Sequence, residues 1–313
     1  MKIAILGAGA LGCYYGARLQ ESGQDVSFIV RSEYGYLKEH GLQVKSLHGN
    51  ISLPRINVYR DTEEVGPVDL VVVAWKSTAN AGFSRALPTL MGPDTTVVTL
   101  QNGMGNAEEI ARIIPADRIY VGLCFICAMR EKPGHVNHLE GGNIQFAPFI
   151  PTPEGTEKAR ELSELFANAG IKTRAFDAAE QLQWYKLVWN IPFNGLCLAL
   201  GGISIAELYQ NPENVVRARR IMEEVVQAAR ARGYACRKIW LDSPFPYGNH
   251  GSFHSVQRRG LQRRPSRRIH GYLGRPSLQG PASRSLRAGM GTSGQGHPQA
   301  PEYKLTRTNC ESC

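Results

Sequence analysis

The chain has 313 residues, of which 42% are apolar, and it carries a formal net charge of +9. This length accommodates two domains of ordinary size with buried cores. No apolar stretch is long enough to span a bilayer and no targeting segment is evident, so the sequence argues against a membrane protein and predicts a cytoplasmic one.

The N-terminus combines a short apolar run with a glycine-rich turn. Residues Ile3–Leu6 have the pattern of a strand, and Cys13–Glu21 is compatible with a helix. Between them, Gly7, Gly9 and Gly12 follow the spacing G-x-G-x-x-G. In a dinucleotide-binding unit the first glycine allows the tight turn, the second lets the backbone approach a pyrophosphate, and the third lets the helix lie close to the strand. The sequence therefore predicts a dinucleotide-binding domain.

The next predicted strand, Asp25–Val30, indicates which dinucleotide is bound. A site for NAD usually ends this strand with Asp or Glu, which accepts hydrogen bonds from the ribose hydroxyls. Here Arg31 and Ser32 follow instead. Because a guanidinium binds phosphate bidentately, Arg31 favours the 2′-phosphate of NADP. The alternative for this residue is an arginine that is merely solvated.

The rest of the first half alternates between strand and helix patterns, which is typical of a parallel, doubly wound Rossmann-type sheet. The predicted strands are Asp69–Ala74, Thr95–Leu100, Arg118–Phe125, a hairpin-like extension Val136–Phe149, and Thr173–Phe176. The predicted helices are Ala107–Ile114 and Glu154–Ala169. We assign residues 1–177 to the NADP-binding domain. Residues 178–236 form an incomplete α-helical substrate domain, with helices expected over Ala178–Leu200 and Asn214–Arg232.

Three polar side chains recur along the predicted helix Ala178–Leu200. Lys186, Asn190 and Asn194 are spaced at i, i+4 and i+8, which places them on one stripe, and the other residues between them are apolar. Such a stripe is costly to bury unless it faces a ligand cavity. A partly desolvated lysine also loses its proton easily, which suits a general acid near neutral pH. The alternative is a solvated helix face, with Pro192 closing the helix.

The C-terminal segment 237–313 has a different composition. It holds 13 Lys and Arg residues against three acidic ones, and it is rich in Arg, Gly, Ser, Pro and Gln. Such a segment buries too little apolar surface to offset its ordering entropy. We interpret it as a disordered basic tail or as the product of a shifted reading frame beginning near residue 240. The alternative is a basic arm for nucleic acid or an acidic membrane surface, which the scarcity of aromatic residues disfavours.

The cysteines do not indicate a disulfide framework or a metal site. The chain has seven, an odd number spread over a long sequence. Cys124 and Cys127 lie in a strand-like run and face opposite sides of the pleat, while Cys310 and Cys313 are far away in the sequence and in no knuckle-like loop. We predict buried or incidental thiols and no metal.

Taken together, these motifs resemble the ketopantoate reductase (2-dehydropantoate 2-reductase) family over residues 1–233. The residues that carry the resemblance are G-A-G-A-L-G at 7–12, Arg31, Trp75-Lys76, Gln101-Asn-Gly-Met-Gly105 and Lys186-x3-Asn190-x3-Asn194. The resemblance implies reduction of 2-dehydropantoate, a small 2-keto acid, to pantoate with NADPH, a step of pantothenate and coenzyme A synthesis.

The resemblance also implies a role for each matching residue. Gly7, Ala8, Gly9, Ala10, Leu11 and Gly12 would cradle the pyrophosphate, Arg31 would bind the 2′-phosphate, and Lys76 and Ala128 would lie beside the cofactor. Asn102 would contact both the nicotinamide side and the substrate. Lys186 would be the general acid, and Asn190 and Asn194 would hold the polar groups of the substrate.

The C-terminal part departs from the family pattern. The family continues with a substrate-binding serine and, after a Gly-Arg-Pro-like stretch, a glutamate that faces the site. Here Gly274-Arg-Pro276 is followed by Ser-Leu-Gln, with no acid until Glu302. The sequence therefore leaves a second function open, an NADP-binding protein without turnover. It also leaves the oligomeric state open, a homodimer included.

Overall fold

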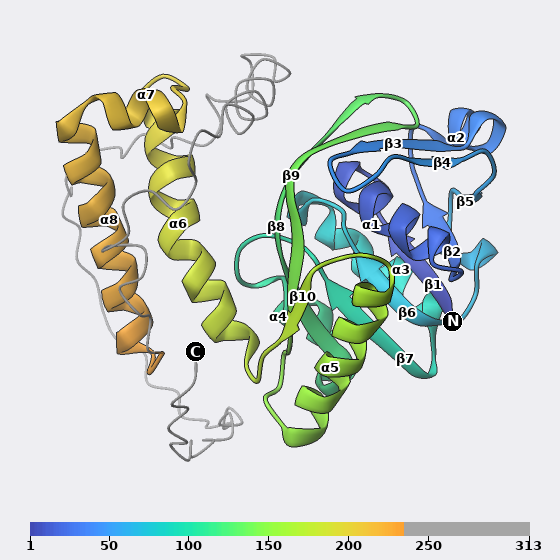
Figure 1. Ribbon diagram of the computed structural model, residues 1–313. Helices are drawn as coiled ribbons and strands as arrows, with labels where there is room; N and C mark the ends of the chain where they lie inside the picture. The colour runs from blue at the N-terminus through green and yellow to red at the C-terminus, as the bar shows by residue number, and fades with distance from the viewer. Residues whose placement is uncertain (235–313) are drawn as a thin grey trace, which may run out of the picture. The chain divides into compact units, whose positions relative to one another are not determined.

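The computed structural model describes residues 1–234, which form a mixed α/β domain followed by a helical one (Figure 1). The strands are β1 (Lys2–Leu6), β2 (Asp25–Ile29), β3 (Leu42–Ser46), β4 (Ile51–Leu53), β5 (Asn57–Tyr59), β6 (Val68–Val73), β7 (Met91–Thr99), β8 (Ile119–Lys132), β9 (His135–Pro148) and β10 (Thr173–Ala175). The α-helices are α1 (Ala10–Glu21), α2 (Tyr34–His40), α3 (Phe83–Leu90), α4 (Asn106–Ala111), α5 (Pro153–Asn168), α6 (Ala179–Ala199), α7 (Ile205–Gln210) and α8 (Pro212–Ala231).

The strands form one sheet in the order β4-β3-β9-β8-β7-β6-β1-β2-β5, with β10 paired to β9. The run from β5 through β2, β1, β6 and β7 to β8 is parallel, whereas β9 is antiparallel to β8. The chain leaves β1 toward β2 on one side and later returns to β6 on the other. This topological switch at β1 opens a crevice at the carboxyl ends of the strands, where ligands bind in sheets of this kind.

Both faces of the sheet are buried, which explains why its central strands are continuously apolar. In β1, Ile3 and Ile5 pack into one core cluster, while Ala4 and Leu6 pack into the other. The first cluster includes residues of α1 and α5, and the second includes residues of α3, α4 and the start of α6. A third cluster joins α6, α7 and α8, which lie side by side in Figure 1. None of the helices within residues 1–234 is long and apolar enough to cross a membrane.

Most of the predicted elements are present, and local capping explains where two of them begin. The Thr152 side chain accepts from the Gly155 backbone N–H at 2.9 Å, so α5 begins at Pro153. The Asn211 side chain caps α8 in the same way, and that helix begins at Pro212, two residues before the predicted start. In α6, Pro192 lies inside the helix and does not close it, because the helix continues to Ala199. The predicted character of the segment 237–313 lies outside the described residues.

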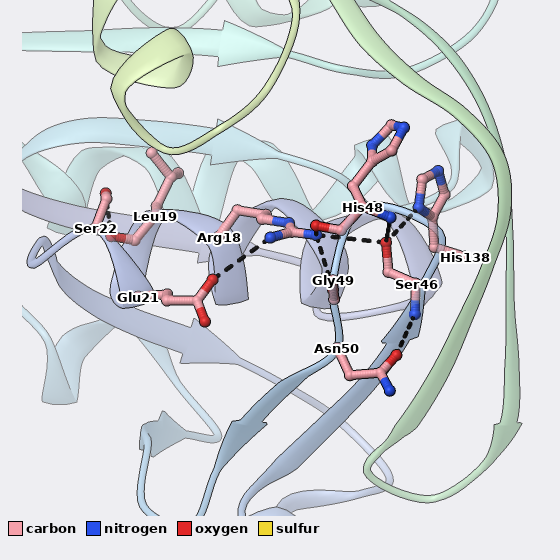
Figure 2. Close-up of polar contacts among 9 residues, drawn as sticks. All are labelled: Arg18, Leu19, Glu21, Ser22, Ser46, His48, Gly49, Asn50 and His138. Carbon is pink, nitrogen blue, oxygen red and sulfur yellow. Dashed lines mark hydrogen bonds and ion pairs between the residues drawn. The ribbon is translucent and has the colours of Figure 1, made fainter.

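A buried arginine joins α1 to the loop between β3 and β4 (Figure 2). Arg18 is only 7% exposed, and its Nη2 donates to the carbonyl oxygens of His48 at 2.8 Å and Gly49 at 2.9 Å. The same nitrogen lies 3.4 Å from Ser46 Oγ. The loop between β3 and β4 makes few regular backbone hydrogen bonds of its own. Because the guanidinium donates to two of its carbonyls, Arg18 fixes the path of this loop against α1.

His138 of β9 completes this cluster as a neutral imidazole. Its Nε2 lies 3.1 Å from the Glu140 carbonyl, which only accepts, so Nε2 carries the proton and Nδ1 accepts from Ser46 Oγ at 2.8 Å. Burial lowers the pKa of His138, and the neighbouring His48 and Arg18 add to this lowering. A neutral ring is therefore the form that fits beside the guanidinium.

We expect Arg18→Met to lower the free energy of unfolding by about 2–3 kcal/mol, because it removes a charged donor shared by two carbonyls. Urea unfolding followed by circular dichroism measures this change. The matched control is Glu21→Gln: Glu21 lies 3.5 Å from Arg18 and its side chain is half exposed, so its loss should cost less than about 0.5 kcal/mol. Equal stability of Arg18→Met and the wild type would show that the guanidinium does not hold the loop.

Candidate functional site

A cavity of about 1600 Å³ lies at the carboxyl ends of the parallel strands. Its walls include the residues that directly follow four of these strands: Gly7 after β1, Val30 after β2, Ala74 after β6 and Leu100 after β7. The opposite wall comes from β8 and from the helices α6 and α7. Ligand sites for one small molecule usually measure about 300–1000 Å³, so this cavity has room for a dinucleotide together with a small substrate.

The three glycines of the turn lie in different surroundings. Gly7 has φ +101°, and a Cβ placed on it would lie 2.5 Å from the Trp75 backbone nitrogen. A Cβ on Gly12 would lie 2.5 Å from the Gly7 carbonyl oxygen, so this residue permits close packing of α1 on β1 and does not line the cavity. A Cβ on Gly9 meets nothing within 4 Å and would project into open space.

The N-terminus of α1 is free to receive an anion. No side chain caps this helix and its first turn contains no acidic residue. The first amides of a helix have no intrahelical acceptor and carry the positive end of the helix dipole. Since Gly9, Ala10 and Leu11 line the cavity, these donors are available where a pyrophosphate would lie.

Two exposed cations lie on the strand side of the cavity. Arg31 follows β2, Lys76 follows β6, and both line the cavity. Neither forms an ion pair with another residue of the described part of the chain. Both positions therefore offer uncompensated positive charge to a bound phosphate.

Lys186 extends from α6 to the sheet and makes two hydrogen bonds there. Its Nζ donates to Asn102 Oδ1 at 2.7 Å and to the Cys124 carbonyl oxygen at 2.5 Å. The same nitrogen lies 5.4 Å from the centre of the Phe125 ring, within the range of a cation–π interaction. All four residues line the cavity, so the ammonium is held at its wall beside the space for ligands.

The Cys124 carbonyl is available because β7 ends early. β7 pairs with β8 only from Val97–Ile119 to Thr99–Val121. Beyond Val121, β8 has no described strand beside it on that side, and Lys186 supplies a donor to this open edge. Because the pairing ends early, the hydrogen bond from Lys186 to the Cys124 carbonyl connects α6 to the sheet.

Burial lowers the pKa of the Lys186 ammonium below the usual lysine value, and the electrostatic effect of Cys124 opposes part of this shift. The cause is removal of the charged form from water. A lysine with a lowered pKa transfers its proton more readily than one in solution. Because two acceptors and an aromatic ring still surround the ammonium, it remains oriented while it is charged.

Asn102 is supported by a network of buried and half-buried side-chain amides. Asn106 Nδ2 donates to the Asn102 carbonyl at 3.1 Å, and Asn80 Nδ2 donates to Asn106 Oδ1 at 3.0 Å. Asn80 Oδ1 in turn accepts from Gln101 Nε2 at 2.7 Å and from the Trp75 indole at 3.1 Å. This network connects the segments after β6 and β7. Asn80 and Asn106 were not predicted from the sequence, because only the folded chain brings the segments after β6 and β7 together.

The helical wall combines polar and aromatic side chains. Asn190 is half-buried and Asn194 is exposed, and both line the cavity with Lys186. Trp189 and Tyr209 line it as well, and both contact Phe193, whose ring centre lies 4.1 Å from that of Trp189 and 5.8 Å from that of Tyr209. The pair Trp189 and Tyr209 was not anticipated from the sequence.

The structure brings together every residue predicted to bind cofactor or substrate except Gly12. The members that line the cavity are Gly7, Ala8, Gly9, Ala10, Leu11, Arg31, Lys76, Asn102, Ala128, Lys186, Asn190 and Asn194. The described cysteines, Cys13, Cys124, Cys127 and Cys197, are all buried. Cys310 and Cys313 lie outside the described residues, and the expectation of no metal stays a prediction.

Comparison with known proteins places this site in a family. The family model "Ketopantoate reductase PanE/ApbA" matches residues 3–150, and the model of that family's C-terminal part matches residues 178–243. The chain is 39% identical over 235 residues to the 2-dehydropantoate 2-reductase of Nostoc sp., which covers 74% of this chain and 73% of the relative.

Solved structures agree with this assignment. The 2-dehydropantoate 2-reductase of Geobacter metallireducens shares 39% identity and superposes with a TM-score of 0.72, covering 88% of this chain and 89% of that one. A D-mandelate dehydrogenase solved with NADH and anilino(oxo)acetate shares 26% identity with a TM-score of 0.69, covering 75% and 76% of the two chains. Since the matches include both the sheet with its glycine turn and the helix α6 with Lys186, the chain belongs to the ketopantoate reductase family.

Proposed function

We propose that this chain reduces 2-dehydropantoate to pantoate with NADPH. The observation that carries the proposal is the position of Lys186, a partly desolvated ammonium bonded to Asn102 in the same cavity as the glycine turn. The 39% identity to a 2-dehydropantoate 2-reductase supports the choice of substrate.

The residues at the strand ends fit a dinucleotide phosphate. The open space beside Gly9 and the uncapped start of α1 suit the pyrophosphate. Arg31, without an acidic partner at the end of β2, suits a 2′-phosphate, whereas an NAD site usually has an acid at this strand end. Lys76 and Ala128 also lie along this wall. When bound, NADPH supplies the hydride for the reduction.

The side chains of α6 and Asn102 would orient the keto acid and complete its reduction. Lys186 would donate a proton to the keto oxygen as negative charge develops there, and its positive charge would stabilise that oxygen beforehand. Asn102 Oδ1 holds the ammonium in place for this transfer. Asn190 and Asn194 offer amide donors and acceptors for the polar groups of the substrate.

A cytoplasmic location is part of the proposal. Cys13, Cys124 and Cys197 are free thiols, as expected for a protein in a reducing compartment. The partner it requires is a small 2-keto acid.

The test is oxidation of NADPH by the full-length chain, followed at the absorbance of the reduced nicotinamide, with and without 2-dehydropantoate. We expect one NADPH to be consumed per 2-dehydropantoate, with pantoate formed in the same amount. Pyruvate and phenylglyoxylate serve as smaller and aromatic 2-keto acids, and we expect both to react more slowly. Binding of NADPH without oxidation in the presence of any of these acids would indicate instead an NADP-binding protein without turnover.

A further inference from the structure

A second arginine lies at the same edge of the sheet as Arg31. β5 pairs with β2 in parallel register, with Ile29 opposite Tyr59, and the Val30 backbone N–H donates to the Tyr59 carbonyl at 3.0 Å. Arg60 therefore follows β5 next to the point where Arg31 follows β2. Both arginines line the cavity, and both are exposed.

The Arg60 side chain is held in place by its surroundings. Its guanidinium carbon lies 4.5 Å from the centre of the Tyr34 ring, which makes that ring a platform for the charged group. The hydroxyl of Tyr34 accepts from Lys38 Nζ at 2.9 Å. The Arg60 backbone N–H donates to Glu64 Oε1 at 3.2 Å, which fixes the main chain at the base of the side chain.

The two acids that line this end of the cavity are paired with arginines other than Arg31 and Arg60. Glu33 Oε1 lies 2.9 Å from Arg130, and Asp61 Oδ1 lies 2.8 Å from Arg85. Arg31 and Arg60 form no ion pair with any residue of 1–234. The site thus presents two guanidinium groups that have no ion-pair partner within residues 1–234. A phosphate monoester carries about −1.5 to −2 charges at neutral pH, which balances them.

We propose that Arg60 is the second guanidinium of the 2′-phosphate site, and that Arg60, together with Arg31, sets the preference for NADPH over NADH. This inference rests on the proposed function, because it assumes that the dinucleotide lies along the glycine turn. Two guanidinium groups from adjacent strands satisfy more oxygen atoms of one phosphate than Arg31 alone. The Tyr34 platform keeps Arg60 oriented before the cofactor arrives, which lowers the entropy lost on binding.

The experiment measures binding, separately from turnover, on the full-length chain. Fluorescence titration gives the Kd values of NADPH and NADH, and calorimetry gives those of 2′,5′-ADP and 5′-AMP, which differ only in the 2′-phosphate. For Arg60→Met we expect NADPH and 2′,5′-ADP to bind about 10- to 100-fold more weakly, the usual range for a charged hydrogen bond. The Kd values of NADH and 5′-AMP should stay at their wild-type values.

Further variants separate this role from general charge. Arg55→Met removes the same charge from an exposed residue of the preceding segment that does not line the cavity, and it should leave all four Kd values unchanged. Tyr34→Leu removes the platform and should weaken binding of the two 2′-phosphate ligands less than Arg60→Met does. Arg60→Lys keeps the charge but loses the bidentate geometry, so an intermediate affinity is expected.

Two results would overturn the inference while the proposed function stands. One is an equal loss of NADPH and NADH affinity in Arg60→Met, which would place the arginine on a part common to both dinucleotides. The other is that Arg60→Met binds NADPH and NADH with the wild-type affinities, while the wild type itself prefers NADPH. A wild type that binds NADH as tightly as NADPH would remove the NADPH part of the proposed function itself, and this inference with it.

Discussion

Replacing Lys186 with methionine is expected to lower kcat for 2-dehydropantoate reduction by about 10²- to 10⁴-fold, the usual contribution of a general acid. Methionine keeps an unbranched, apolar stem, so the packing of α6 changes little. The lost group is the ammonium that donates to Asn102 Oδ1 and the Cys124 carbonyl. Both acceptors line the cavity, where water can replace the missing donor. Stopped-flow measurement of NADPH oxidation at saturating substrate tests the chemical step directly.

The control for this variant is Lys186→Arg. A guanidinium keeps the positive charge that stabilises the developing oxyanion, but its pKa is too high for it to give up a proton readily. We expect KM to change little and kcat to fall. The Kd of NADPH, measured by fluorescence, should remain at the wild-type value in both variants. Turnover of Lys186→Met at the wild-type rate would assign the proton donor to another group or to water.

The pH dependence of kcat in the wild type should also show that Lys186 is the proton donor. The donor must be protonated, so kcat falls as pH rises through the pKa of Lys186. Because burial lowers that pKa, the decline should begin at a lower pH than for a lysine in water. This alkaline decline should be absent from the pH profile of Lys186→Met, whose residual rate no longer depends on the lysine.

The glycine turn provides the second large effect, in a pair of variants. Gly7→Ala forces an alanine to adopt φ +101° and places its Cβ 2.5 Å from the Trp75 backbone nitrogen. Backbone strain and overpacking each cost about 1–3 kcal/mol, so we expect the free energy of unfolding to fall by about 3–5 kcal/mol. Thermal and urea unfolding measure the loss. An unchanged unfolding midpoint would mean that the turn can shift away from Trp75.

Gly9→Ala is the matched variant, because Gly9 lies in the same turn two residues after Gly7. Gly9 has φ −79°, which alanine adopts freely, and its added Cβ meets no protein atom within 4 Å. We therefore expect the stability to stay within about 0.5 kcal/mol of the wild type. NADPH should bind about 10- to 100-fold more weakly, since the methyl group occupies the space of the pyrophosphate. Tight NADPH binding by this variant would place the pyrophosphate elsewhere.

The sequence predicted those parts of the site that depend on local spacing. In the G-x-G-x-x-G turn, the strand, the glycines and the helix follow one another directly along the sequence. Lys186, Asn190 and Asn194 share one face of a helix because of their spacing alone. These groups do line one cavity. Arg31 was recognisable because it replaces an acid at a strand end whose position the glycine turn fixes.

The remaining parts depend on contacts between distant segments. Arg60 follows a strand of three residues, Asn57–Tyr59, whose pairing with β2 leaves too short a pattern to recognise. Asn80 and Asn106 become neighbours only when the segments after β6 and β7 meet. The strands β3 and β4, at one end of the sheet, were missed for a related reason, since each mixes buried and exposed residues over five residues or fewer.

The early end of β7 has a consequence for how this chain tolerates amino-acid substitution at the site. One of the two acceptors that orient Lys186 is a main-chain oxygen, and every amino acid at position 124 supplies the same atom. The other acceptor belongs to the Asn102 side chain and disappears with a single codon change. Of the two hydrogen bonds that Lys186 donates, the one to the backbone oxygen therefore does not depend on which side chain occupies position 124. A substitution at position 124 keeps this acceptor and is limited by the packing of the buried side chain, whereas a substitution of Asn102 removes its acceptor.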